Sequence, residues 1–290
     1  MSLQSKLLEW LRTTGYPFQL HAGRALQLAG WHVNYSRWYR DPVTSKLREL
    51  DLQALVGAVR PGESSLFFSL VIECKSSSSQ PWVGLSSSKD GGGRSFLASA
   101  PGGMTRSFAL AAQFLELTLP QLLPSDTLYA DSVIAGFVED PPGDQTPSSK
   151  RGKPKEQSDP TSPHSALLQP VSAASALDTD FFNTALTARP EIATATALLP
   201  VVLLRGRLFA YTVAADLQDE LLEVGALLVS VPTDNEDRST LVAVLTEEGA
   251  KAVWKPMLNA AHQFCVSALP HARRIANALT MNESEMEKNI

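Results

Sequence analysis

The spacing of apolar residues predicts two helices at the start of the chain. Residues 3–13 place leucines and a tryptophan on one face of a helix. Residues 17–29 form a second predicted helix, in which Pro17 suits the first turn and Gly30 closes the end. This opening is amphipathic and polar, without the layout of a secretion signal.

Three strands are predicted next, at residues 31–39, 47–59 and 66–75. The first two are joined by a polar turn, and the third is apolar at nearly every position. A run of that kind is typical of a central strand covered on both faces.

The rest of the chain alternates further helices and strands with polar segments. The pattern predicts a Ser/Gly-rich loop (76–103), a helix (107–123), a strand (131–139), an alanine-rich helix (170–188), a β-hairpin (199–213), strands (226–231 and 239–245), a helix capped by Thr246, and a polar tail (281–290). We therefore expect an α/β fold with a mixed central β-sheet flanked by helices, and an additional C-terminal β-hairpin and helices.

The organisation along the chain follows from composition. Residues 1–139 form the predicted core, and residues 140–163 have the Pro, Ser and Lys content of a flexible insertion or linker. Residues 164–290 are expected to form an α/β extension packed on the same sheet.

Charge is unevenly distributed along the chain. The net charge is -5, yet residues 1–110 carry 12 Lys and Arg against 7 Asp and Glu. This distribution suits a phosphate-bearing ligand near the N-terminal part, although uneven surface decoration gives the same counts. Two cysteines make neither a disulfide framework nor a four-cysteine zinc site, and no apolar run reaches the length of a membrane span. We expect a cytoplasmic protein with no membrane partner.

Candidate chemistry lies at the ends of two neighbouring predicted strands. Asp51 stands between Leu50 and Leu52, which we expect on the opposite face, and the third strand ends in Glu73-Cys74-Lys75. Alternation turns Glu73 and Lys75 to one face. Two carboxylates, with the backbone carbonyl of Cys74, suit Mg²⁺. The alternatives are a solvated surface ion pair for Glu73 and Lys75, and a structural hydrogen bond for Asp51.

An aspartate on one strand followed by acid-x-lysine on the next resembles the PD-(D/E)xK nuclease superfamily, which has a restriction-endonuclease-like fold. The preceding "GYPFQLHAGRALQLAGW" and "DPVTSKLRELD", and Pro81-Trp82 after the motif, match it as well. The resemblance implies a Mg²⁺-dependent endodeoxyribonuclease, with Mn²⁺ able to substitute, acting in prokaryotic defence or DNA processing. Asp51 and Glu73 would hold the metal, and Lys75 would position water or stabilise charge on the phosphate.

The chain departs from this family at Gln19, which stands where many members carry a glutamate on the first core helix. Gln19 is expected either to assist catalysis or to be a helix-surface amide. The departure supports a second hypothesis, a catalytically impaired nuclease fold that serves as a nucleic-acid-binding or scaffolding subunit. A third hypothesis is a structural interaction protein that docks through residues 140–163.

The hairpin before Asp51 carries the candidate DNA contacts. Its basic residues either hold the phosphate backbone or decorate an exposed turn: Arg37, Arg40, Lys46 and Arg48. Trp38 and Trp82 are predicted to pack in the core rather than stack on bases. A homo-oligomer or an accessory protein partner is left open.

Overall fold

The structure is a computed structural model that describes residues 2–76, 80–86, 127–135, 162–188, 193–213, 218–232 and 239–273. Its helices are α1 (Leu3–Thr13), α2 (Tyr16–Ala29), α5 (Pro163–Ala188) and α6 (Glu247–Ala268), followed by the short 3-10 turn η2 (Leu269–His271). The predicted helix 107–123, the tail 281–290 and nearly all of the segment 140–163 lie outside the described residues.

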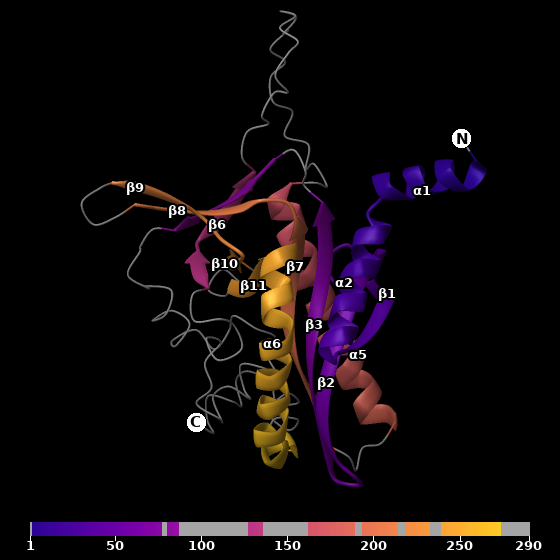
Figure 1. Ribbon diagram of the computed structural model, residues 1–290. Helices are drawn as coiled ribbons and strands as arrows, with labels where there is room; N and C mark the ends of the chain where they lie inside the picture. Colours follow the sequence, from indigo (N-terminus) through magenta and orange to yellow (C-terminus); the bar gives the residue numbers. More distant parts are fainter. Residues whose placement is uncertain are drawn as a thin grey trace, which may run out of the picture.

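Seven of the described strands form one mixed sheet in the order β1-β2-β3-β7-β11-β10-β5 (Figure 1). The strands are β1 (His32–Arg40), β2 (Leu47–Arg60), β3 (Ser64–Ser76), β7 (Ala193–Arg205), β11 (Ser239–Thr246), β10 (Ala226–Pro232) and β5 (Leu128–Ala130). The strands β1, β2 and β3 are antiparallel, whereas β3, β7 and β11 run parallel. The expected α/β class with a mixed central sheet is therefore confirmed, and strands from both ends of the chain share that sheet.

A second sheet combines four further described strands in the order β6-β4-β8-β9. They are β6 (Ser132–Ala135), β4 (Trp82–Ser86), β8 (Leu208–Val213) and β9 (Asp219–Glu223). The predicted hairpin over residues 199–213 is wrong, because β7 pairs with β3 and β11 while β8 pairs with β4 and β9. The physical reason is that β7 is apolar on both faces and so sits centrally between two parallel strands, which leaves no edge for β8.

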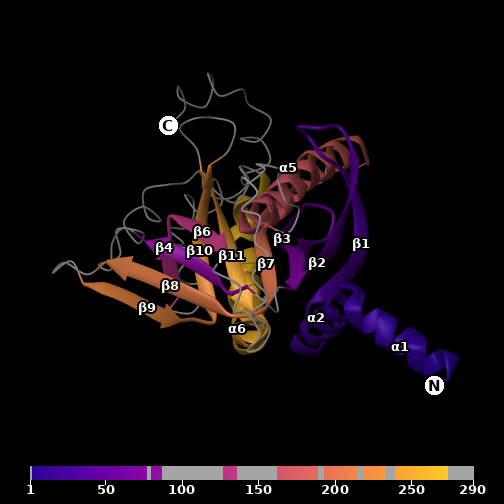
Figure 2. The ribbon, with the colours of Figure 1, turned by 90° about the horizontal axis from the view of Figure 1, so that it is seen from above.

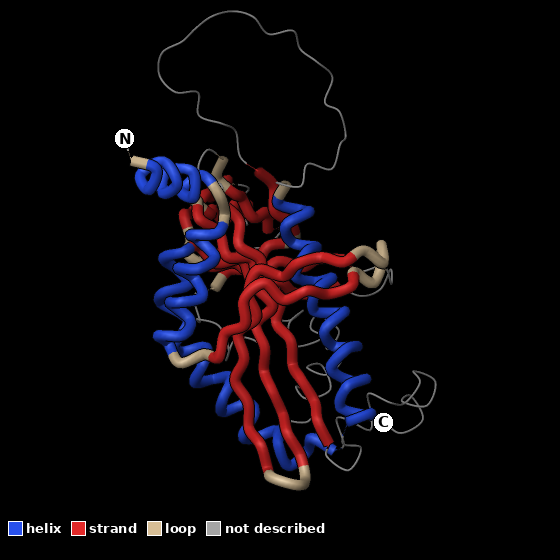
Figure 3. Tube along the Cα trace, turned by 90° about the vertical axis from the view of Figure 1, so that its right-hand side faces the viewer, coloured by secondary structure: helices blue, strands red, loops and turns tan. Residues whose placement is uncertain are grey.

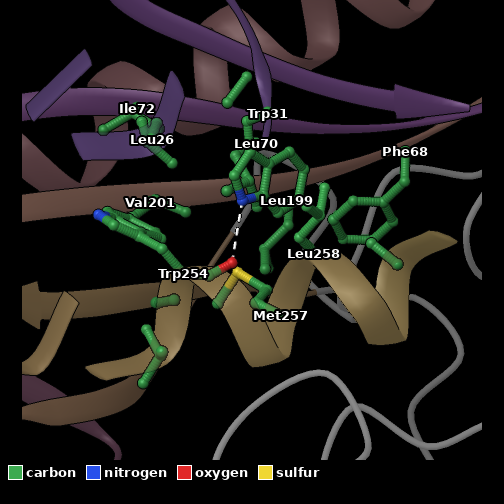
Figure 4. Packing of buried hydrophobic residues seen from close by; sticks show 14 of the residues in the cluster. Leu26, Trp31, Phe68, Leu70, Ile72, Leu199, Val201, Trp254, Met257 and Leu258 are labelled. Carbon is green, nitrogen blue, oxygen red and sulfur yellow. Dashed lines mark hydrogen bonds between the residues drawn. The ribbon is translucent and has the colours of Figure 1, made fainter. Parts of the chain in front are cut away.

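Helices α2 and α6 cover one face of the large sheet (Figure 2). Alternate residues of β3, such as Leu70 and Ile72, point into this layer. Figure 4 shows Trp31 in the layer, where its indole Nε1 donates to the backbone carbonyl of Trp254 at 3.0 Å. A buried indole N–H that finds a partner avoids the cost of an unpaired donor.

The opposite face is covered by α5 and by the small sheet, so that helices stand on both sides of the long strands (Figures 2 and 3). Val71 of β3 and Leu198 of β7 pack under α5. Trp82 of β4, 2% exposed, packs on the strands beyond β7, as predicted. Gly84 allows this close approach, because a Cβ there would meet the side chains of Leu227 and Ala130.

Two predicted helix ends are confirmed. Gly30 closes α2 with a φ of 107°, a left-handed conformation that glycine adopts without a Cβ penalty. Thr246 caps α6, since its side-chain oxygen accepts from the backbone N–H of Gly249 at 3.0 Å.

Helix α1 forms as predicted but stands away from the sheet (Figures 1 and 2). Its apolar face is largely exposed, from Leu11 at 36% to Leu3 at 73%. Neither this helix nor any other that the structure describes combines the length and apolar character needed to cross a bilayer.

Candidate active site

The strands β2 and β3 separate at Asp51. Their antiparallel pairing runs from Arg60 opposite Ser64 to Leu52 opposite Ile72, with no pair recorded beyond that point. Asp51 follows, and its Oδ2 accepts from the backbone N–H of Cys74 at 2.7 Å. The Asp51 carboxylate therefore takes the place of the next ladder bond, so Asp51 makes the structural hydrogen bond that was the alternative to a metal-binding role. Its metal-binding role stays a prediction.

The alternation of side chains between the two faces of the sheet is interrupted at Asp51 and at Ser36, the residue opposite it on β1. Ser36 of β1, which lies opposite Asp51 between two regular pairs, has a φ of 52°. Leu52 packs under α2 and α6, whereas Leu50 packs under α5. The expectation that both leucines share a face is wrong, because the alternation of β2 changes face at Asp51, the position opposite Ser36.

Glu73 and Lys75 share one face of β3, as predicted. Lys75 Nζ lies 2.9 Å from Glu73 Oε1, and Glu73 is only 7% exposed. The alternative of a solvated surface pair is therefore wrong. Burial and the nearby charge of Asp51 raise the pKa of Glu73 to about 7, and the Lys75 ammonium only partly offsets this effect.

Asp51 is perturbed in the same direction. Burial raises the pKa of its carboxyl, against the opposing effects of the Cys74 N–H and the Lys75 charge. Two acids thus share one ammonium group in a poorly hydrated place. An additional positive charge would relieve the cost of ionising both of them.

Gln19 reaches this site from α2. Its Nε2 donates to the backbone carbonyl of Asp51 at 2.6 Å, and the residue is 5% exposed. The helix-surface alternative for Gln19 is therefore wrong. The amide holds the backbone of Asp51 where β2 leaves β3, and the catalytic role expected of Gln19 stays a prediction.

Cys74 contributes to the site through its backbone. Its N–H is bonded to Asp51, while its side chain packs against the core under α2 and α6. Burial, together with the neighbouring acids Asp51 and Glu73, raises the pKa of the thiol well above its ordinary value. A metal-binding role for the Cys74 carbonyl stays a prediction.

The four basic residues of the hairpin lie on β1, on β2 and, for Lys46, in the turn between them, and three of them have partners within the hairpin. Arg37 Nη1 donates to Gln53 Oε1 at 2.6 Å, and Arg40 Nη1 donates to the carbonyl of Ser45 at 2.7 Å. Arg48 forms an ion pair with Asp41 at 2.6 Å, and Lys46 is exposed. Their role in DNA binding stays a prediction.

Two residues near the site, Arg205 and Glu49, were not predicted to be there. Arg205 ends β7 beside Ser76, 4.4 Å above the ring of Phe18, and Glu49 raises the pKa of both site carboxyls. Trp38 is 58% exposed, so its predicted core position is wrong. Arg205 closes an apolar run just as Glu73 and Lys75 do, and that signal was available in the sequence.

The fold and site together define a mixed α/β protein with Asp51 inside β2 and Glu73 and Lys75 near the end of the neighbouring strand β3. Across the part of the chain that the structure describes, no group of three or more His, Cys, Asp or Glu side chains is arranged to hold a metal ion. Comparison with protein-family models, with curated proteins and with solved structures gives no match.

Proposed function

We propose that the protein is a metal-dependent nuclease of the PD-(D/E)xK type that hydrolyses phosphodiester bonds of DNA. The observation that supports the proposal is the part-buried Asp51 carboxylate where β2 leaves β3, together with the ion pair of buried Glu73 and half-buried Lys75 on β3. The order of helix, strand, hairpin and acid-x-lysine strand supports the same proposal.

A divalent cation fits the charge of this site. Burial is the main cause that raises the pKa values of Asp51 and Glu73, and the charge of Asp51 raises the pKa of Glu73 further. A cation beside these carboxylates would favour their ionised forms. Mg²⁺ needs only one or two protein carboxylates, since water and substrate phosphate complete its shell. When bound, the metal would supply Lewis-acid polarisation of the phosphate and activation of water.

The chain's own residues have separate tasks in this proposal. Hydrolysis forms a bond from water oxygen to phosphorus and breaks one phosphorus–oxygen ester bond, and negative charge grows on the phosphate oxygens. Lys75 brings positive charge to that position, and the Glu73 partner holds its ammonium in place. Gln19 fixes the backbone of Asp51.

The experiment is nicking of supercoiled plasmid with Mg²⁺, Mn²⁺ or EDTA. We expect cleavage with either metal, none with EDTA, and a loss of about 100-fold or more for Lys75→Met and Asp51→Asn. The matched control is Lys251→Met, because Lys251 is an exposed lysine of α6 paired with Glu248. Inactivity of the wild type on every DNA form, or full activity of Lys75→Met, would overturn the proposal.

The second candidate is a nuclease fold without catalysis that binds nucleic acid or acts as a scaffold. Gln19 favours it, because an amide already committed to the Asp51 carbonyl adds no charge for a second metal. DNA binding by the wild type, without cleavage in any divalent metal, would support this candidate over the first.

A further inference from the structure

Helix α1 is built to form a helix but packs poorly on its own molecule. Ser2 caps it, since the Ser2 hydroxyl accepts from the backbone N–H of Ser5 at 3.2 Å, and its leucines recur along one face. Every residue from Leu3 to Leu11 is nevertheless exposed in the described structure, and α1 points away from the sheet (Figures 1 and 2). Because a helix of this length is barely stable alone in water, α1 needs a surface to cover.

Helix α2 carries an apolar surface on its outward side. Its inward side, which includes Phe18, packs on the large sheet. On the other side Tyr16 and Leu20 are each 57% exposed, and Leu28 is 73% exposed. These three residues are spaced by multiples of four positions, so they form one row along the helix, which we call the α2 row. Arg24 stands in this row, and its apolar stem can lie along a partner while its charge stays in water.

The two surfaces match in length. At 1.5 Å per residue, the face of α1 from Leu3 to Leu11 is about 12 Å long, and the row from Tyr16 to Leu28 is about 18 Å long. Since both surfaces are exposed among the described residues, α1 does not cover the α2 row of its own chain. A second molecule offers α1 the row that it lacks, and offers the row a helix of suitable length.

The apolar area is large enough for a stable contact between two copies. The residues concerned are Leu3, Leu7, Leu8 and Leu11 of α1 and the three residues of the α2 row. At roughly 100 Å² for each exposed side chain, they offer about 700 Å² per copy, close to the ~800 Å² that each partner buries in a standard interface.

The charges of α1 favour a protein surface over a lipid surface. Its charged residues are Lys6, Glu9 and Arg12, which are of both signs. Helices that lie on membranes are instead rich in Lys and Arg on their polar face. A partner of protein chemistry with an exposed apolar row therefore suits α1 better than a bilayer does.

We propose that the occupant is a second copy of this chain, in a symmetric dimer where α1 of each copy packs on the α2 row of the other. Such an exchange is self-complementary, because each copy gives one helix and receives one, so the assembly closes at two chains. The proposal goes beyond the proposed nuclease activity and does not depend on it.

The test is the mass of the whole chain in solution, measured by light scattering after size-exclusion chromatography at low and high micromolar concentration. We expect twice the mass of one chain for the wild type. Leu7→Glu on α1 and Leu20→Glu on α2 should each weaken the dimer by about 10-fold or more, because each places a charge in the apolar contact. Leu221→Glu is the matched control, since Leu221 lies on β9 and is 58% exposed, and it should leave the mass unchanged.

A second α2 variant, Leu28→Glu, covers the case in which Leu20→Glu fails to fold, which circular dichroism detects. A monomeric wild type at both concentrations would overturn the dimer, including a monomer that binds vesicles of phosphatidylserine and phosphatidylcholine. Loss of the dimer in Leu7→Glu but in neither α2 variant would overturn the exchange, because α1 would then pack on another surface. The assay contains neither DNA nor metal, so the dimer and the cleavage reaction succeed or fail separately.

Discussion

Glu73 makes the stability of the metal-free protein depend on pH. In the unfolded chain its carboxyl has the ordinary pKa of 4.5, and in the folded protein burial and Asp51 raise that pKa to about 7. As pH rises between these values, the unfolded chain releases a proton that the folded protein retains. The contribution of Glu73 to stability is therefore present below pH 4.5 and is lost as pH rises to about 7.

The gap between the two pKa values corresponds to about 3 kcal/mol. Glu73→Gln keeps the size of the side chain and removes its titration. Wild type and Glu73→Gln should thus be similar in stability near pH 4.5, and the variant should be more stable by about 2–3 kcal/mol above pH 7. In Glu73→Gln, the positive charge of Lys75 still stabilises the ionised form of Asp51.

The assay is urea unfolding in EDTA, followed by tryptophan fluorescence across this pH range. The control is Glu63→Gln, since Glu63 lies in an exposed turn and pairs with Arg60 at 3.3 Å. Added Mn²⁺ should raise the stability of the wild type above pH 7 and leave Glu73→Gln nearly unchanged. Parallel pH profiles for wild type and Glu73→Gln would refute the reasoning.

Three further substitutions test separate parts of the structure. Gln19→Leu leaves the Asp51 carbonyl unpaired and should cost about 1–3 kcal/mol in urea unfolding, and an unchanged midpoint would contradict the positioning role. Thr246→Ala removes the cap of α6 and should cost about 1 kcal/mol by the same measurement, whereas Thr246→Ser should retain most of the stability. Trp38→Ala removes an exposed ring, so stability should stay within about 0.5 kcal/mol, while DNA binding measured by fluorescence anisotropy should weaken; equal DNA affinity would exclude stacking by Trp38.

Local patterns were sufficient for most elements and for the centre of the site. The apolar run that ends in Glu73 and Lys75 predicted both the central strand and the shared face, because alternation along a strand depends only on neighbouring residues. The caps at Gly30 and Thr246 were predictable for the same reason, since each acts within one helical turn.

Features that depend on distant partners were not predictable. The separation of β7 from β8 depends on β3 and β11, which pair with β7 from far away in sequence. Ser36 has a positive φ, Trp38 is exposed, and Leu50 and Leu52 pack on opposite faces, although all of these positions have the sequence pattern of a regular strand. The commitment of Gln19 to the Asp51 carbonyl likewise needs the position of α2 against β2.

The most direct test of the proposed site is calorimetric titration of the wild type with Mn²⁺ at pH 7.5, beside Asp51→Asn and Glu73→Gln. The charge of the paired carboxyls predicts one saturable Mn²⁺ site per chain in the wild type, lost or strongly weakened in both variants. Absence of Mn²⁺ binding to the wild type, or equal binding to all three proteins, would contradict a metal site at Asp51 and Glu73.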